Sequence, residues 1–262
     1  MGRKTRRGAD ILSRRKPVRA TAPADDPLMD TAFAKDRTAP APVAGVEAAP
    51  GFDGEFETHL TVAADHAGAL QRFAAAHGFK CLHIELARGV RAFQPMLSWR
   101  GRGDFARQRA QADAVAAQLR AHGMQPLRIK IEAAPGNRDV PQDDAQAVAG
   151  RYFESHIKLL LEAGADLTEL AERVRGHSAH LSRNALRTRE DGLDQRFVTQ
   201  RSHGGLRRAY AELRALLDVL DGAGLRRLGV ETEYVVYDDN LAVDDGWIDL
   251  ATDGPLAQRG KR

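Results

Sequence analysis

The stretch Phe-Glu-Thr-His-Leu-Thr-Val at residues 56–62 returns 97 positions later as Phe-Glu-Ser-His-Ile-Lys-Leu at residues 153–159. The first copy alternates between two sets of side chains, which is the pattern of a half-buried β-strand. Because chance agreement over such a run is improbable, the repeat predicts two diverged copies of one structural unit.

The residues after each copy predict the same order of elements. In the first copy we expect a helix capped by Asp65, strands at 80–86 and 93–100, a helix from Asp104 to His122, and a strand at 127–132. In the second we expect a helix from Asp166, strands at 178–184 and 195–203, a helix at 206–220, and a strand at 228–237. The fold class is therefore α+β: two tandem ferredoxin-like (β-α-β-β-α-β) units related by a pseudo-two-fold, with antiparallel sheets and helices on one face.

The sequence leaves the packing of the two sheets open, because the sheets can stack or their edges can join into one long sheet or a closed barrel. We expect a disordered leader at residues 1–52, basic and then rich in Ala and Pro. The first repeat spans 53–133, a linker 134–151, the second repeat 152–240, and a C-terminal tail 241–262.

Charge and cysteine content narrow the class of protein. Residues 1–20 hold eight Arg and Lys against one acid, and Arg259, Lys261 and Arg262 add more, so the body between them is net acidic. We therefore expect nucleic acid to bind only through the basic N-terminal arm. The chain has one cysteine and no long apolar run, which predicts a cytoplasmic protein that does not enter a membrane.

Alternation assigns side chains to the two faces of each predicted sheet. On the face away from the helices we expect, in the repeated strands, Glu57, His59, Thr61, Glu154, His156 and Lys158; in the second strands, His83 and His180; and in the last strands, Glu132 and Glu233. By the same rule Leu82, Ile84 and Leu86 are expected to face the helices.

Paired histidines and carboxylates suit two kinds of chemistry. Imidazoles beside carboxylates act as general acid and base, which makes His59, His156, Glu57 and Glu154 the candidate catalytic residues. The same groups are ligands of divalent metals, for which the candidates are His83, Glu132, His180 and Glu233. The alternative is that these polar pairs only satisfy each other where the sheets meet.

The segment His59-Leu60-Thr61 resembles the His-x-Thr/Ser motif of the 2H phosphoesterases, which have two similar lobes with one motif in each. The resemblance implies that two histidines act as acid and base on a phosphodiester while hydroxyls hold the phosphate. The second copy has Lys158 where that family has a hydroxyl, so the resemblance covers one of the two motifs.

Donors that suit an anionic ligand cluster in the second copy. The candidate ligand-binding residues are Thr61, Lys158, Arg201, Gln200, His203, Ser182 and Arg183, since hydroxyl, amide and cationic groups bind carboxylate and phosphate. A hairpin rim followed by a Gly-rich turn is the structural alternative for residues 199–205.

These observations favour an enzyme, or a binding protein, for a small molecule that bears a phosphate or a carboxylate. Two other classes stay open: an RNA-associated module, because ferredoxin-like sheets bind RNA on an open face, and a non-catalytic assembly protein. The sequence leaves open whether the protein is an enzyme, and likewise its substrate and oligomeric state.

Overall fold

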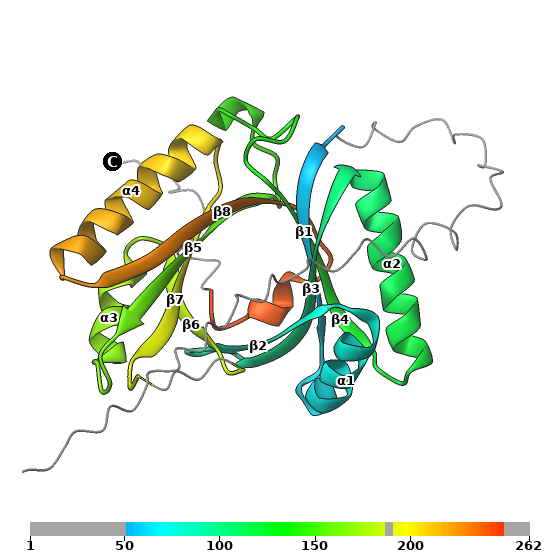
Figure 1. Cartoon of the computed structure of the whole chain (residues 1–262). Coiled ribbons are helices and arrows are strands. Elements are labelled where there is room, and N and C mark those ends of the chain that lie inside the picture. Colours follow the sequence, from blue (N-terminus) through cyan, green and yellow to red (C-terminus); the bar gives the residue numbers. More distant parts are fainter. Residues whose placement is uncertain (1–50, 187–190, 249–262) are drawn as a thin grey trace, which may run out of the picture. The chain divides into compact units, whose positions relative to one another are not determined.

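The computed structural model describes residues 51–186 and 191–248. Residues 1–50 of the leader expected at 1–52, and residues 249–262 of the tail expected at 241–262, lie outside the described residues. The described chain is a mixed α+β fold in which eight antiparallel strands form one sheet (Figure 1). The strands are β1 (Asp53–Val62), β2 (Lys80–Leu86), β3 (Phe93–Asp104), β4 (Pro126–Ala133), β5 (Tyr152–Leu161), β6 (Ala179–Asn184), β7 (Asp194–Ser202) and β8 (Arg226–Asp238).

The sheet closes on itself as a barrel with the strand order β1-β3-β2-β6-β7-β5-β8-β4. Two seams join the N-terminal and C-terminal halves. At one seam β2 pairs with β6, where Ile84 lies opposite Asn184; at the other β4 pairs with β8, where Lys130 lies opposite Asp238. Of the arrangements that the sequence left open, the chain adopts the closed barrel, which leaves no strand edge of the sheet unpaired.

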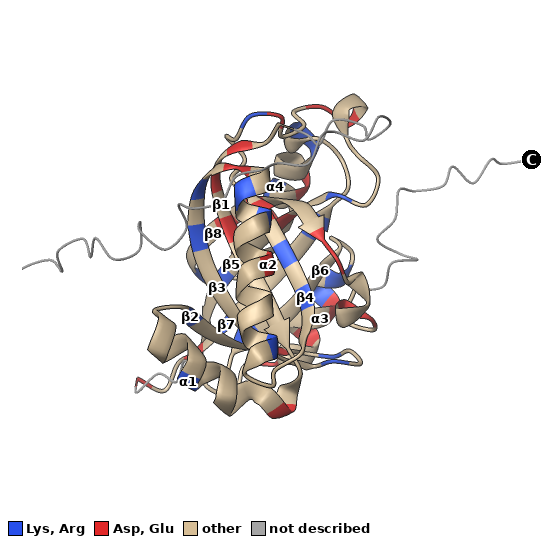
Figure 2. Cartoon of the chain, turned by 90° about the vertical axis from the view of Figure 1, so that its right-hand side faces the viewer, with Lys and Arg blue, Asp and Glu red and all other residues tan. Residues whose placement is uncertain are grey.

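Four α-helices pack on the outside of the barrel (Figure 1): α1 (Ala67–His77), α2 (Phe105–Ala121), α3 (Leu167–Arg175) and α4 (Leu206–Gly222). Helices α1 and α2 cover the strands of the first half, and α3 and α4 cover those of the second. Figure 2 shows α2 crossing the strands, with acidic and basic positions mixed over that side. None of the described helices is long and apolar enough to cross a membrane.

Two hydrophobic cores lie between the helices and the outer strand faces, and the first of them also includes Phe153, Ala209, Tyr234 and Val236 of the second half. Phe56, Leu60 and Val62 of β1 belong to the first core, and Ile157 and Leu159 of β5 to the second. These are the apolar positions of the repeated stretch. Side chains alternate between the two faces of a strand. Because these apolar side chains pack against the helices outside the barrel, the Glu and His between them point into the barrel.

Three aspartates were predicted to cap the N-termini of helices, and two of these predictions are confirmed. Asp104 accepts a hydrogen bond from Arg107 N, and Asp166 accepts from the backbone of Thr168 and Glu169, so both cap helices as expected. The prediction for Asp65 is wrong. It lies in the short 3-10 helix η2 (Ala64–His66), which takes up the first turn before α1 begins.

One end of the barrel is filled by residues 239–248, which we call the C-terminal plug. It contains the 3-10 helix η4 (Leu241–Asp244), visible within the ring of strands in Figure 1. Its side chains enter the barrel: Asp244, Trp247 and Ile248 are at most 5% exposed, and Trp247 Nε1 donates to Leu181 O at 3.1 Å. Residues 241–248, assigned to a tail from the sequence, are therefore a folded part of the barrel.

Candidate functional site

The barrel encloses a cavity of about 1080 Å³, a volume that includes its open mouth. The C-terminal plug closes one end of it through Asp244 and Trp247. At the other end the side chains remain in solvent, with Lys80 55%, Arg100 73% and Glu231 72% exposed. The cavity is therefore a well that the plug closes at one end and that opens at the other, a concave shape typical of small-molecule sites.

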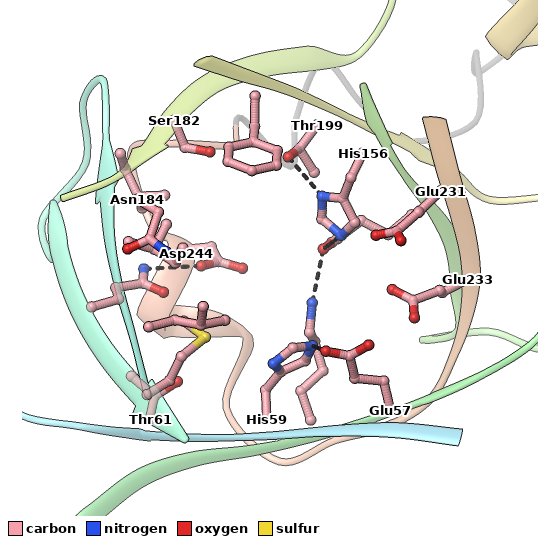
Figure 3. Close-up of a pocket in the computed structure, with 18 of the residues that line it drawn as sticks. Glu57, His59, Thr61, His156, Ser182, Asn184, Thr199, Glu231, Glu233 and Asp244 are labelled. Carbon is pink, nitrogen blue, oxygen red and sulfur yellow. Dashed lines mark hydrogen bonds and ion pairs between the residues drawn. The ribbon is translucent and has the colours of Figure 1, made fainter. Parts of the chain in front are cut away.

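Both histidines of the repeated stretch point into this well (Figure 3). His59 Nε2 lies 2.8 Å from Glu132 Oε2 and 4.0 Å from Glu57 Oε1, so Glu132 rather than Glu57 orients its ring. His59 Nδ1 is buried without a hydrogen-bond partner. A buried ring nitrogen of this kind is costly unless a ligand or water satisfies it.

His156 lies on the opposite strand and is held at both ring nitrogens. Nδ1 is 3.0 Å from Thr199 Oγ1, and Nε2 is 3.3 Å from Glu154 Oε1. Burial by itself lowers the pKa of His156, but the hydrogen bond and charge of Glu154 outweigh it, so the pKa is raised above 6.5. Glu154 therefore favours the protonated form of His156, in which both ring nitrogens carry a proton.

A buried ion network lies beneath the histidines. Lys130 Nζ is 2.8 Å from both Glu132 Oε1 and Glu154 Oε1, and Arg201 Nε donates to Glu154 Oε2 at 2.8 Å. Burial works to raise the pKa of Glu132, but the charges of Lys130 and His59 lower it to about 2. The pKa of Glu154 is likewise held well below its usual range by Lys130 and Arg201, against its burial. Both carboxylates are therefore ionised and fixed in place.

The plug anchors itself to the same network through Asp244. Its Oδ2 accepts from Arg128 Nη1 at 2.9 Å and from Arg201 Nη2 at 2.6 Å, and Gln94 Nε2 donates to Oδ1 at 3.2 Å. Arg128 also binds Asp238 at the end of β8. Both guanidinium groups are thus engaged by carboxylates of the chain itself.

Glu233 is the carboxylate in the well that has no cation of its own. Within the described residues it makes no hydrogen bond or ion pair, and Figure 3 shows it pointing into the cavity. Burial, followed by the charge of Glu132, raises the pKa of Glu233 to about 8. At neutral pH this carboxyl is therefore mostly protonated. Glu233 also lies close to Glu132 and His156: one potential metal-ligand atom of each of the three residues lies within 4.8 Å of the other two.

The structure brings together the candidates on the repeated strands and disperses several others. Glu57, His59, Thr61, Glu154, His156, Lys158, Ser182, Arg201 and Glu233 line the well, and Glu132 lies next to it. His83, Arg183, Gln200 and His203 do not line it. Gln200 Nε2 donates to the carbonyls of His177 and Glu212, outside the barrel, and His203 contacts Tyr152. Arg183 pairs with Glu85 on the outer face, and His180 packs against Trp247 of the plug.

The face prediction for β2 is wrong. Leu82, Ile84 and Leu86 line the well, whereas Cys81 packs on the outer core and the ring of His83 meets that of Phe93 edge to face. The prediction assumed that apolar side chains pack against the helices, but the apolar side chains of β2 line the cavity. His83 is therefore turned away from Glu132 and Glu233, so these residues do not form one metal site.

Sequence reasoning missed the plug and its partners Arg128 and Gln94. The signal was the apolar pair Trp247-Ile248, which follows Asp244-Asp245-Gly246 and is unusual for a solvated tail. It also missed Thr199, which follows from the cross-strand pairing of β5 with β7. No family model and no curated protein matches this chain.

Proposed function

We propose that the chain is an enzyme, or a binding protein derived from one, that holds a small anionic molecule inside the barrel with His59 and His156 as an acid–base pair. One observation carries the proposal: two imidazoles from opposite strands face a single well, and each is held by a buried carboxylate, Glu132 or Glu154. General acid–base chemistry needs such positioned groups.

The contacts of the rings suggest different roles. His59 donates from Nε2 to Glu132, which leaves the lone pair of Nδ1 to accept a proton. His156 is favoured as the imidazolium by Glu154 and acts as the acid. Glu57, which accepts from Ser98 Oγ and Arg100 Nε, borders His59 without orienting it.

In this proposal Lys158 binds the anion, and the hydroxyl group of Thr61 lines the closed end of the well. Lys158 lines the well, lies 5.7 Å from the ring of Phe197, and forms no ion pair with another described residue. Arg201 contributes indirectly, because its Nε and Nη2 are bound to Glu154 and Asp244. Its role is to fix Glu154 under His156.

We also propose that the halves are ferredoxin-like copies of one unit. Support comes from the order β4-β1-β3-β2 in the first half and β8-β5-β7-β6 in the second, which place equivalent strands in equivalent positions. Each seam joins a strand to its own counterpart. The well would then have formed by duplication, with one histidine supplied by each copy.

We expect His59→Ala and His156→Ala each to weaken binding of phenyl phosphate at least about tenfold, because each removes a charged or hydrogen-bonded contact. Isothermal titration calorimetry measures the affinity, and thermal melting the stability. His66→Ala, in η2 outside the well, is the matched control and should leave the affinity unchanged. Loss of stability in both variants with affinity intact would show that the histidines are structural.

A second candidate function is a divalent-metal site formed by Glu132, His156 and Glu233, favoured by their donor atoms lying within 4.8 Å. One imidazole and two carboxylates suit Mn²⁺ or Zn²⁺. Against it, Lys130 already lies 2.8 Å from Glu132. If the metal site exists, Mn²⁺ binds to the wild type, and Glu233→Gln weakens it at least about tenfold whereas Glu231→Gln does not. Titration calorimetry with Mn²⁺ on the wild type and the two variants shows whether the metal site exists.

A further inference from the structure

The wall of the well is divided into two halves of different chemistry. Strands β1, β4, β8 and β5 are consecutive in the barrel, and their inward side chains are almost all charged or polar. Strands β3, β2, β6 and β7 form the other half. There the inward side chains and the plug contribute an apolar surface of Leu82, Ile84, Leu86, Met96, Phe197 and Trp247, which we call the apolar wall.

The apolar wall is separate from the two cores beneath the helices. Leu86 and Trp247 are buried against each other and Ile248, with Ile84 packed beside them. Leu82, Ile84, Met96 and Phe197 are only partly buried and face the open well, while the outward positions of β2 hold Cys81, His83 and Glu85. Exposed apolar surface costs roughly 25 cal/mol per Å² relative to burial. A ligand that covers the partly buried side chains of Leu82, Met96 and Phe197 would gain this energy.

Apart from Lys80 at the open mouth and Arg201, which Glu154 and Asp244 already bind, the polar groups that the strands of this half turn inward are neutral. Ser182 and Asn184 of β6 lie near the apolar side chains and provide hydroxyl and amide groups, and Thr199 of β7 reaches His156 (Figure 3). Lys158 marks the boundary between the halves, because its ammonium lies over the ring of Phe197. A bound molecule therefore meets a cation and an aromatic face at one point.

We infer that the ligand is an amphipathic anion, whose aryl or branched alkyl body lies on the apolar wall while its carboxylate or phosphate faces Lys158 and His156. This inference rests on the proposed function and narrows it. A sugar phosphate or another polar anion would place hydroxyl groups against Leu82, Ile84 and Met96, where few partners exist to replace lost water. Discrimination by such a surface is set by buried apolar area.

The test compares ligands with one head and different bodies. We expect phenyl phosphate to bind at least about tenfold more tightly than glucose 6-phosphate, measured by titration calorimetry. Met96→Gln and Phe197→Leu, which preserve volume or apolar character, should weaken phenyl phosphate about 3- to 10-fold and leave glucose 6-phosphate unchanged. Val90→Asn, an apolar-to-polar change at a residue 81% exposed outside the well, is the matched control.

Two outcomes separate this inference from the proposed function. If glucose 6-phosphate binds as tightly as phenyl phosphate, and the wall variants are indifferent while His156→Ala weakens both, the inference is overturned and the proposed function stands. If 2-phenylethylamine binds more tightly than 3-phenylpropionate, the head group is a cation and the proposed function is overturned. Unchanged melting temperatures in the wall variants exclude unfolding as the cause.

Discussion

Glu154→Gln is expected to lower the free energy of unfolding by about 3–5 kcal/mol, the usual cost of removing one partner from a buried ion pair. Glu154 is 2% exposed, and it accepts from Lys130 Nζ and Arg201 Nε, both at 2.8 Å. The substitution keeps the volume but leaves two buried cations with one carboxylate fewer. Chemical denaturation measures the loss, which corresponds to a fall in Tm on the order of 10 °C.

The matched control is Glu57→Gln, the equivalent change on the first repeated strand. Its main cationic partner, Arg100, is 73% exposed, so water can replace the lost contact. We therefore expect a loss of about 1 kcal/mol or less. Equal losses in the two variants would mean that the network around Lys130 is not the stabilising element that its geometry indicates.

Glu233→Gln is expected to raise stability, and increasingly so as the pH rises from about 4.5 to 8. The pKa of Glu233 is about 8 in the folded chain, raised by burial and by Glu132, against 4.5 ordinarily. Between these values the folded chain binds a proton that the unfolded chain has released, so stability falls as pH rises. The wild type should therefore lose on the order of 4 kcal/mol across this window, and the neutral glutamine should escape that loss.

Denaturation curves at several pH values, recorded with EDTA to remove any metal, test the effect. Glu231→Gln is the control because Glu231 lies two residues away on the same face of β8 and is 72% exposed. We expect its stability to follow the wild type at every pH. A Glu233→Gln curve that ran parallel to the wild type would show that Glu233 titrates normally.

The repeated strands made most of the fold predictable from the sequence. The apolar positions of 56–62 and 153–159 face helices, so alternation assigned Glu57, His59, Glu154 and His156 to the opposite face, which is the inside of the barrel. Barrel closure was not predictable. Its seams depend on non-local pairings such as Ile84 with Asn184, for which the local pattern of neither strand contains a signal.

The residues of the site could be predicted only on strands whose polar side chains line the well and whose apolar side chains face the helices. The side chains of β2 that line the cavity are apolar. The rule that places leucine against helices therefore assigned the two faces of β2 the wrong way round and predicted that His83 faces the site. The partner of His59 was also missed, because Glu132 and Glu57 both lie beside it and only the geometry gives 2.8 Å for one and 4.0 Å for the other. Arg201 seemed free to bind an anion because Asp244 lies 43 residues away in sequence.

The two seams also determine how this chain must fold as it is made. When the first four strands have emerged, β2 and β4 are both open edges, and their partners β6 and β8 have yet to be synthesised. Open edges recruit strands from other chains, and pairing over such sequence distances is slow. We therefore expect the nascent first half to be the most aggregation-prone state of this protein, and a chain that stops before β8 to remain there.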